Sequence, residues 1–257
     1  MEVHHHPKVD SDSHRKKNFK EYFLEFLMIF LAVTMGFFAE NIREGITNRK
    51  KEKQYMVLLE QDLKKDTAAL HYSIRRLNRD FSSEDSIISL FAENKLGERN
   101  DSTLSFLFIT SGLSVDIVFN DRAATQLKNS VAMRLIRHRD VAENILQYWN
   151  NQIRINQIHD RFENERLQHH QVAYRTFNWY REYYINAEGR SNAVLHSRPK
   201  AIVNPGNLNE FVNIVSGLYN TGKTQYMPYL EEQLQLANKL IGLIKEEYDL
   251  PVETNED

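Results

Sequence analysis

The chain has no cysteine and little glycine or proline, with nine glycines and five prolines in 257 residues. The lack of cysteine excludes structural disulfides but is compatible with an oxidising or a reducing compartment. Long stretches without glycine or proline are typical of helices and disfavour a β-sandwich, which needs frequent turns. An excess of one charge is also missing, since 33 basic residues stand against 35 acidic ones. A near-neutral chain argues against a nucleic-acid partner, which would favour a basic excess.

One long apolar run is present near the start of the chain, from Tyr22 to Ala39, and reads YFLEFLMIFLAVTMGFFA. As a helix it would be about 27 Å long, close to the roughly 30 Å of a bilayer hydrocarbon core. The alternative of a buried helix in a soluble core is disfavoured because no other stretch is comparably apolar. A cleaved signal peptide would need small residues before the cut, but Phe37 and Phe38 precede Ala39. We therefore predict an uncleaved single-pass membrane anchor.

Basic residues around this run predict its orientation, because lysine and arginine collect on the cytoplasmic side. Four of them precede the run within a few residues, namely Arg15, Lys16, Lys17 and Lys20. On the carboxyl side only Arg43 is equally close, although Arg49, Lys50, Lys51 and Lys53 follow soon after. The bias favours a cytoplasmic amino terminus, with the large carboxy-terminal part periplasmic or extracellular.

Two glutamates, one within the apolar run and one at its end, are candidate functional residues. Glu25 lies inside the run, and Glu40 closes it. An ionisable group in a membrane segment is a functional candidate by default. Glu25 is only one turn inside, so anchoring at the interface is the favoured interpretation. A contact in an oligomer of packed anchors and the handling of ions or protons are the alternatives.

The rest of the chain has the periodicity of amphipathic helices. Residues 40–81 carry apolar side chains at steps of three and four, and neither proline nor glycine lies between Gly45 and Gly97. The anchor is therefore expected to continue into a stalk helix, with Gly45 as a flexible point. A short helix capped by Ser82 or Ser83 should follow and extend through residue 94.

Further helices are predicted from about 104 to 111, from 120 or 121 onward, from about 140 to 185, from 208 to about 219, and from 226 to 248. Long amphipathic helices joined by loops predict an all-α fold in which one transmembrane helix continues into an antiparallel bundle. The predicted divisions are a basic, histidine-containing segment 1–21, the transmembrane helix 22–39, the stalk and short helix 40–95, the bundle 96–250 and a disordered tail 251–257.

One motif, Gly217 to Thr224 (GLYNTGKT), fits the phosphate-binding pattern G-x-x-x-x-G-K-[ST]. In such a loop backbone N–H groups cradle phosphates, Lys223 would reach them and Thr224 would hold magnesium. The expected context of strands is missing, and little chain follows Thr224. We interpret the motif as a helix ending near Asn220, a turn through Gly222 and a new helix. Nucleotide binding stays a remote alternative.

Histidines near the amino terminus are weak candidates for metal ligands. His4, His5 and His6, with Glu2 and His14, offer imidazole and carboxylate groups to a transition metal. Adjacent histidines in a flexible segment bind metals weakly because no fixed geometry is available. We therefore predict no metal site in this segment.

The stretch 163–171 (ENERLQHHQ) is rich in side chains that ligate metals. A di-iron bundle would need Glu-x-x-His pairs on two helices. Glu163 and Glu165 are instead followed three residues later by Arg166 and Gln168. We interpret the stretch as a solvated face with salt links, and we predict no cofactor and no catalytic residue in the chain.

Three stretches resemble a family of uncharacterised single-pass membrane proteins of Bacteroidota. Phe23 to Glu40 is similar to its motif, in which aromatic-Glu-Phe-Leu-Met-x-Phe-Leu-Ala-Val leads to Gly-Phe-x-Ala-Glu, and the chain also shares the start MEVHHH. Residues 119–137 and 240–250 are similar too. The family has Ser-Gly-Gly where this chain has Ser-Val-Ala at 130–132, which predicts a continuous helix there. The resemblance implies a native MEVHHH start, an inner-membrane anchor and a helical domain, without a known activity.

The sequence therefore favours a non-enzymatic, membrane-anchored interaction, scaffold or sensor protein. Its expected partners are membrane lipid and either another protein or further copies of itself, since an anchor and a stalk favour oligomers. The main alternative is a subunit of an ion-conducting or ion-driven complex in which Glu25 is the working carboxylate.

Overall fold

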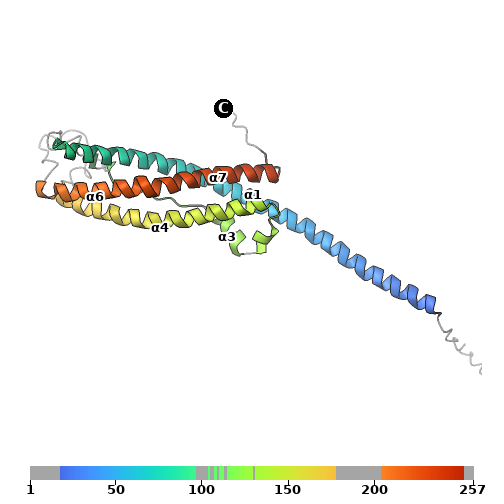
Figure 1. The fold of residues 1–257 in the computed structure, drawn as a ribbon. Coiled ribbons are helices and arrows are strands. Elements are labelled where there is room, and N and C mark those ends of the chain that lie inside the picture. Colours follow the sequence, from blue (N-terminus) through green and yellow to red (C-terminus); the bar gives the residue numbers. More distant parts are fainter. Residues whose placement is uncertain are drawn as a thin grey trace, which may run out of the picture. The chain divides into compact units, whose positions relative to one another are not determined.

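The computed structural model describes residues 18–96, 115–129, 131–177 and 204–251, together with Leu104, Leu107, Phe108 and residues 110–112. These residues form helices joined by turns and short extended segments, and they contain no β-strand (Figure 1). The predicted all-α fold is confirmed. The chain divides into two compact units, Met1–Lys51 and Glu52–Asp257.

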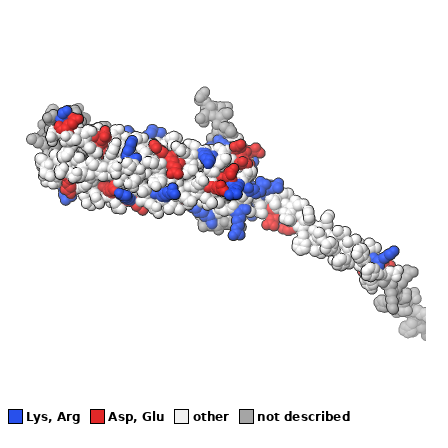
Figure 2. Space-filling model, in the orientation of Figure 1, with Lys and Arg blue, Asp and Glu red and all other residues white. Residues whose placement is uncertain are grey.

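The first unit contains the beginning of helix α1, which spans Phe19–Ala92. The helix starts after Asn18, whose backbone N–H donates to Glu21 Oε2 at 3.3 Å, as in one half of a capping box. An 18-residue window has a mean hydropathy of 2.0 and no buried residue. Figure 2 shows this stretch as a surface almost free of charge. By length and composition α1 is able to cross a membrane, as the sequence predicts.

The second unit is a bundle of three helical rods. The first is α1 from Glu52 onward, the second is α4 (Arg139–Thr176), and the third consists of α6 (Leu208–Thr221), η5 (Gly222–Tyr226) and α7 (Met227–Glu247) in unbroken succession. Between the first two rods lie α3 (Arg122–Asn129) and the 3₁₀ helix η2 (Val131–Leu135).

Three apolar clusters fix the directions of the rods. One cluster joins Met56, Ile145 and Ile244. The cluster at the opposite end joins Ile87, Val172 and Val215, and a middle one lies between them. The third rod therefore runs antiparallel to α1 and α4, which run in the same direction (Figure 1). The chain between α1 and α4 returns along the bundle, which makes this parallel pair possible.

The apolar stripe predicted on α1 forms its core face. Leu59, Leu63, Leu70, Leu77 and Phe81 are at most 3% exposed. Burial of each such side chain stabilises the fold by about 1.5–3 kcal/mol relative to exposure. The hydrophobic period is therefore sufficient to orient this helix in the bundle.

The predicted break at Ser82 or Ser83 is wrong, because α1 continues to Ala92. Each serine hydroxyl donates instead to a backbone carbonyl four residues earlier, at 2.9 and 3.3 Å, which a helix interior tolerates. The helix ends where Asn94 adopts a positive φ of 56°. The Lys95 N–H then donates to the Leu90 carbonyl at 2.8 Å, the closing bond of a left-handed cap.

The predicted continuous helix through 130–132 is also wrong. Helix α3 ends at Asn129, and the 3₁₀ turn η2 begins at Val131. Beyond η2 the Arg137 N–H donates to Glu52 Oε1 at 2.8 Å. This long-range bond holds the turn against α1, and local helix preference cannot anticipate it.

Helix α4 ends nine residues earlier than the predicted end at residue 185. Phe177 is extended, and its ring packs against those of Phe108 and Phe211, with ring centroids 3.6 and 4.8 Å away. The Thr176 carbonyl accepts from the Asn204 N–H at 3.3 Å. The described part of α4 therefore ends where this aromatic packing begins, and the predicted helical residues 178–185 lie outside the described residues.

Candidate functional site

The two glutamates predicted as anchor positions lie on the first part of α1. Glu25 is partly exposed and Glu40 is exposed. The Arg43 guanidinium donates to both Glu40 oxygens, at 2.5 and 2.9 Å. This pair lowers the pKa of the Glu40 carboxyl. Glu40 therefore follows the apolar run as an ionised and paired group.

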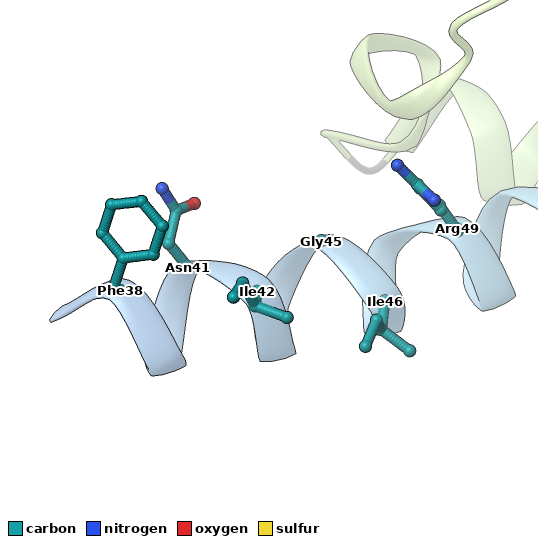
Figure 3. Close-up of a pocket in the computed structure, with 6 residues that line it drawn as sticks. All are labelled: Phe38, Asn41, Ile42, Gly45, Ile46 and Arg49. Carbon is teal, nitrogen blue, oxygen red and sulfur yellow. The ribbon is translucent and has the colours of Figure 1, made fainter. Parts of the chain in front are cut away.

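A shallow groove lies on α1 just after the apolar run. Gly45 lacks a side chain, so the space above it is open between the neighbouring residues (Figure 3). The lining residues are Phe38, Asn41, Ile42, Gly45, Ile46 and Arg49. Asn41 and Arg49 point to one side in Figure 3, and the two isoleucines lie toward the other. Gly45, predicted as a flexible point, is helical in the structure.

The phosphate-loop motif lies within continuous helix. Gly217 belongs to α6, and Gly222 opens the π-helical turn η5 with φ of −62°. Lys223 lies 5.5 Å from the centre of the Phe81 ring, and Thr224 donates to the Asn220 carbonyl at 2.7 Å. The predicted turn through Gly222 is absent, and helical backbone N–H groups are not arranged to cradle a phosphate.

Gly222 has a packing role instead of a turning role. A Cβ atom there would lie 2.5 Å from the Phe81 ring and 3.0 Å from the Phe162 ring. Both distances are shorter than ordinary van der Waals contact. The glycine lets the third rod approach α1 and α4 closely, and the π turn accommodates this approach.

A row of buried acidic residues follows α1 through the bundle. Glu52, Asp62, Asp66, Asp80 and Glu84 are each at most 2% exposed. Their spacings combine helical steps of three and four residues, so they share the side of the helix that faces the other rods. Buried carboxylates are costly unless hydrogen bonds compensate them. The hydrogen-bond partners of each carboxylate therefore determine its charge and its structural role.

Glu52 holds two distant parts of the chain. Its carboxylate accepts from the Arg137 backbone N–H at 2.8 Å, from Arg137 Nε at 3.0 Å and from the Tyr248 hydroxyl at 2.7 Å. Burial acts to raise the pKa of Glu52, but these donors outweigh it and lower the pKa. Glu52 therefore remains ionised as a structural clamp.

Asp62 and Asp66 fix the start of α3 in the same way. Asp62 accepts from the Ala123 N–H at 2.8 Å, at the helix amino terminus. Asp66 accepts from the Asn120 N–H at 2.8 Å and from the Tyr148 hydroxyl at 2.7 Å. Burial raises the pKa of Asp66 despite these bonds. The two aspartates attach the returning segment to α1.

Asp80 and Glu84 differ from the other acids. No described residue donates a geometrically sound hydrogen bond to any of their four carboxyl oxygens. Burial raises the pKa of Asp80 to about 7, against the nearby arginines. Burial raises the pKa of Glu84 to about 8, and the neighbouring charge of Asp80 adds to the shift. This pair therefore takes up or releases protons near neutral pH.

Helix α4 supplies a buried histidine, His169, and a half-buried one, His170. His169 is fully buried, and its Nε2 lies 3.2 Å from the Ser111 hydroxyl. Burial lowers the pKa of His169 to about 3, with smaller contributions from His170 and Arg166. His169 is therefore neutral in the folded chain at any pH near 7.

Gly112 lies near both the acids of α1 and the histidines of α4. It has a φ of +69°, and a Cβ there would lie 2.6 Å from His169 Nδ1. Burial raises the pKa of Glu84 and lowers that of His170, and the Gly112 backbone opposes both shifts to a smaller extent. We name this group the carboxylate–histidine cluster, made of Asp80, Glu84, Ser111, Gly112, His169 and His170.

The structure changes the interpretation of residues 163–171. The predicted solvated face is wrong for His169, which is fully buried. A predicted salt link is present, since Glu163 and Arg166 pair at 2.6 Å, although their side chains are only 20% and 16% exposed. His169 is buried in part because Gly112 lies directly against its ring. In the described part of the chain no three His, Asp or Glu side chains converge as metal ligands. His4, His5 and His6 lie outside the described residues.

The sequence analysis did not predict the buried acidic residues of α1, although their spacing from the apolar residues indicated them. Asp66 and Asp80 each follow a buried leucine, Leu63 and Leu77, by three residues. A carboxylate that recurs in phase with the apolar stripe faces the core and needs a partner. His169 carries the same signal, since it lies seven residues after Phe162 and four before Ala173, which are both buried. Its contact with Gly112, distant in sequence, has no local signal.

Comparisons with protein-family models, with curated proteins and with solved structures gave no match. The resemblance in the anchor therefore stays a prediction. The fold and the hydropathy define the class of the chain: its described residues are helical, and among them one helix near the amino terminus is long and apolar enough to cross a membrane.

Proposed function

We propose that the chain is a single-pass inner-membrane protein whose helical bundle is a non-enzymatic interaction, scaffold or sensor module. The observation that carries the proposal is the exposed apolar stretch of α1, in the same helix that supplies one rod of the bundle. A stretch with this hydropathy and no buried side chain is unfavourable in water and favourable in lipid.

The sensor role draws support from the carboxylate–histidine cluster. Asp80 and Glu84 titrate near neutral pH while buried, so a change of proton activity alters charge inside the bundle. The clamps formed by Glu52, Asp62 and Asp66 tie the returning segment to α1. The bundle therefore combines a buried titrating pair near one end with fixed carboxylate clamps near the other.

Orientation is the testable part of this proposal. We propose a cytoplasmic amino terminus and a periplasmic bundle. The chain has no cysteine, so single-cysteine variants report their own compartment. Asn238→Cys on exposed α7 should react with a maleimide that does not cross the inner membrane, and Asn18→Cys should react only after lysis. The opposite pattern overturns the orientation.

The alternative proposal, ion handling by Glu25, draws on the position of this acid within the exposed apolar helix. Glu25→Gln should then abolish the cellular function while membrane assembly stays intact. Glu21→Gln, one turn earlier on the same helix, is the matched control. Normal function of the Glu25→Gln variant rejects this alternative.

A further inference from the structure

The shallow groove on α1 just after the apolar run has an apolar lining. Phe38, Ile42 and Ile46 are between 51% and 67% exposed, and the two isoleucines lie beyond Glu40, where the run has already ended. Steps of four residues place these three side chains along one face of the helix. We name them the apolar row. Apolar surface therefore extends past the run on one side of α1.

Two polar side chains line the same groove. Asn41 and Arg49 point to one side of α1 (Figure 3). Gly45 lies four residues after Asn41 and four before Arg49, and no side chain of another turn lies within 4 Å of the Cβ position that it leaves empty. The three positions share a helix face. The missing side chain therefore opens a groove of about 350 Å³ between an amide and a guanidinium, which we name the Gly45 groove.

Arg49 brings an available positive charge to the Gly45 groove. Its side chain is exposed, and it forms no ion pair or hydrogen bond with any residue that the structure describes. Arg43, by contrast, is held by Glu40. Side chains on a helix lean toward its amino terminus, which is the direction of the apolar run. The guanidinium of Arg49 therefore borders the groove from the side remote from the run.

The charge of this stretch favours an anion. Apart from the ion pair just described, Glu44 is the one acid as far as Lys51, against the three basic residues Arg49, Lys50 and Lys51. Basic residues beside a membrane attract anionic lipid headgroups. A guanidinium binds phosphate oxygens through two parallel N–H donors, and an amide supplies a further donor. The groove therefore matches a phosphate ester that carries apolar chains.

The position along α1 fits a lipid headgroup. The polar layer of a bilayer extends about 5–8 Å beyond each side of the hydrocarbon core. At 1.5 Å per residue, Asn41 and Gly45 lie about 3 and 9 Å past Ala39, the last residue of the apolar run. The Gly45 groove therefore starts within the headgroup layer when the run fills the hydrocarbon core.

We propose that the Gly45 groove binds one anionic phospholipid, whose phosphate is held by Arg49 and Asn41 while an acyl chain lies along the apolar row. The inference rests on the proposed anchoring of α1 in a membrane and adds a ligand of defined chemistry. A zwitterionic phospholipid also has a phosphate, but its own cation opposes the charge of Lys50 and Lys51. The groove therefore selects a lipid of net negative charge.

Native mass spectrometry of the full chain in mild detergent counts bound lipid directly. The chain is titrated with phosphatidylglycerol or with phosphatidylcholine that has the same acyl chains. One phosphatidylglycerol should bind at least about tenfold more tightly than phosphatidylcholine. Equal affinity for the two lipids overturns the proposal. Displacement of the lipid by an equal concentration of inorganic phosphate, or a second protein chain bound in place of lipid, overturns it as well.

Matched variants assign the lipid to the groove. Arg49→Gln should weaken phosphatidylglycerol binding about fivefold, and Lys51→Gln, which removes the same charge on a different face, should weaken it less. Gly45→Leu fills the groove and should weaken binding several-fold, whereas Gly36→Leu, at an equally open glycine inside the run, should not. Leucine favours a helix over glycine, so both leucine variants keep α1 helical. Equal effects of a variant and its control contradict the site.

Membrane retention separates the two levels of proposal. If the chain resists alkaline extraction but shows no preference for phosphatidylglycerol, the lipid site falls and the anchor stands. If alkali releases the chain from native membranes, the proposed function itself fails, whatever the lipid titration gives.

Discussion

The Tyr148 hydroxyl on α4 donates a 2.7 Å hydrogen bond to Asp66 Oδ2 on α1, inside the core of the bundle. The other Asp66 oxygen, Oδ1, accepts from the backbone and the side chain of Asn120. Burial, followed by the charge of Asp66, raises the pKa of the Tyr148 hydroxyl. One carboxylate therefore joins α1, α4 and the segment that returns between them.

Removal of the Tyr148 hydroxyl should weaken this junction. Tyr148→Phe keeps the ring but leaves one Asp66 oxygen without its donor, which should lower the free energy of unfolding by about 1–3 kcal/mol. Urea unfolding followed by circular dichroism measures the change. Tyr55→Phe, at a partly buried tyrosine of the same cluster, is the control and should change stability less. Equal effects would mean that the hydroxyl of Tyr148 has no special role.

The pH dependence of stability should follow Glu84. Its pKa is about 8 in the folded chain and near 4.5 when unfolded. The unfolded chain therefore gives up this proton first, and folding becomes less favourable as pH rises from about 5 to about 8. Glu84→Gln removes this group from the titration, so the variant should gain stability over the parent chain progressively across that range.

Thermal unfolding at pH 5, 7 and 9 checks this expectation. The gain for Glu84→Gln should be small at pH 5 and at least about 1 kcal/mol at pH 9. Asp85→Asn changes an exposed neighbouring acid and should give no comparable trend. A Glu84→Gln effect that is independent of pH would contradict the assignment of Glu84 as a buried titrating group.

Two glycines should respond oppositely to the same substitution. Gly112→Ala places a Cβ 2.6 Å from His169 Nδ1 at a φ of +69°, so it should destabilise the chain by more than about 1 kcal/mol. Gly217→Ala lies in helix α6, where no atom lies within 4 Å of the new Cβ. It should be neutral or stabilising by up to about 1 kcal/mol. Calorimetric unfolding of both variants gives the comparison, and similar shifts would refute it.

Periodicity predicted the faces of the helices better than it predicted their ends. The stripe on α7, including Leu230, Ala237 and Ile244, is buried as its spacing requires. Helix ends depend on contacts that are distant in sequence, such as the rings around Phe177. At Gly222 the third rod closely approaches Phe81 of α1 and Phe162 of α4. This packing is not visible in the local sequence, where the glycine suggested a turn.

The candidate site was less predictable than the fold for a similar reason. The acids of α1 share a period with the apolar stripe, and that much is visible in the sequence. Their roles differ because Glu52 meets Arg137 and Tyr248, whereas Glu84 meets the backbone of Gly112. A single sequence specifies the side chain but does not show which distant backbone comes to lie against it.

Alkaline carbonate extraction of native membranes tests the central claim, that the first part of α1 anchors the chain. The full chain should remain with the membrane pellet. Leu31→Arg with Val33→Arg, inside the apolar run, should shift most of it to the supernatant, while Thr47→Arg with Asn48→Arg, beyond the run on the same helix, should not. Release of the unmodified chain, or retention of the Leu31 and Val33 double variant to the same extent, would contradict the account.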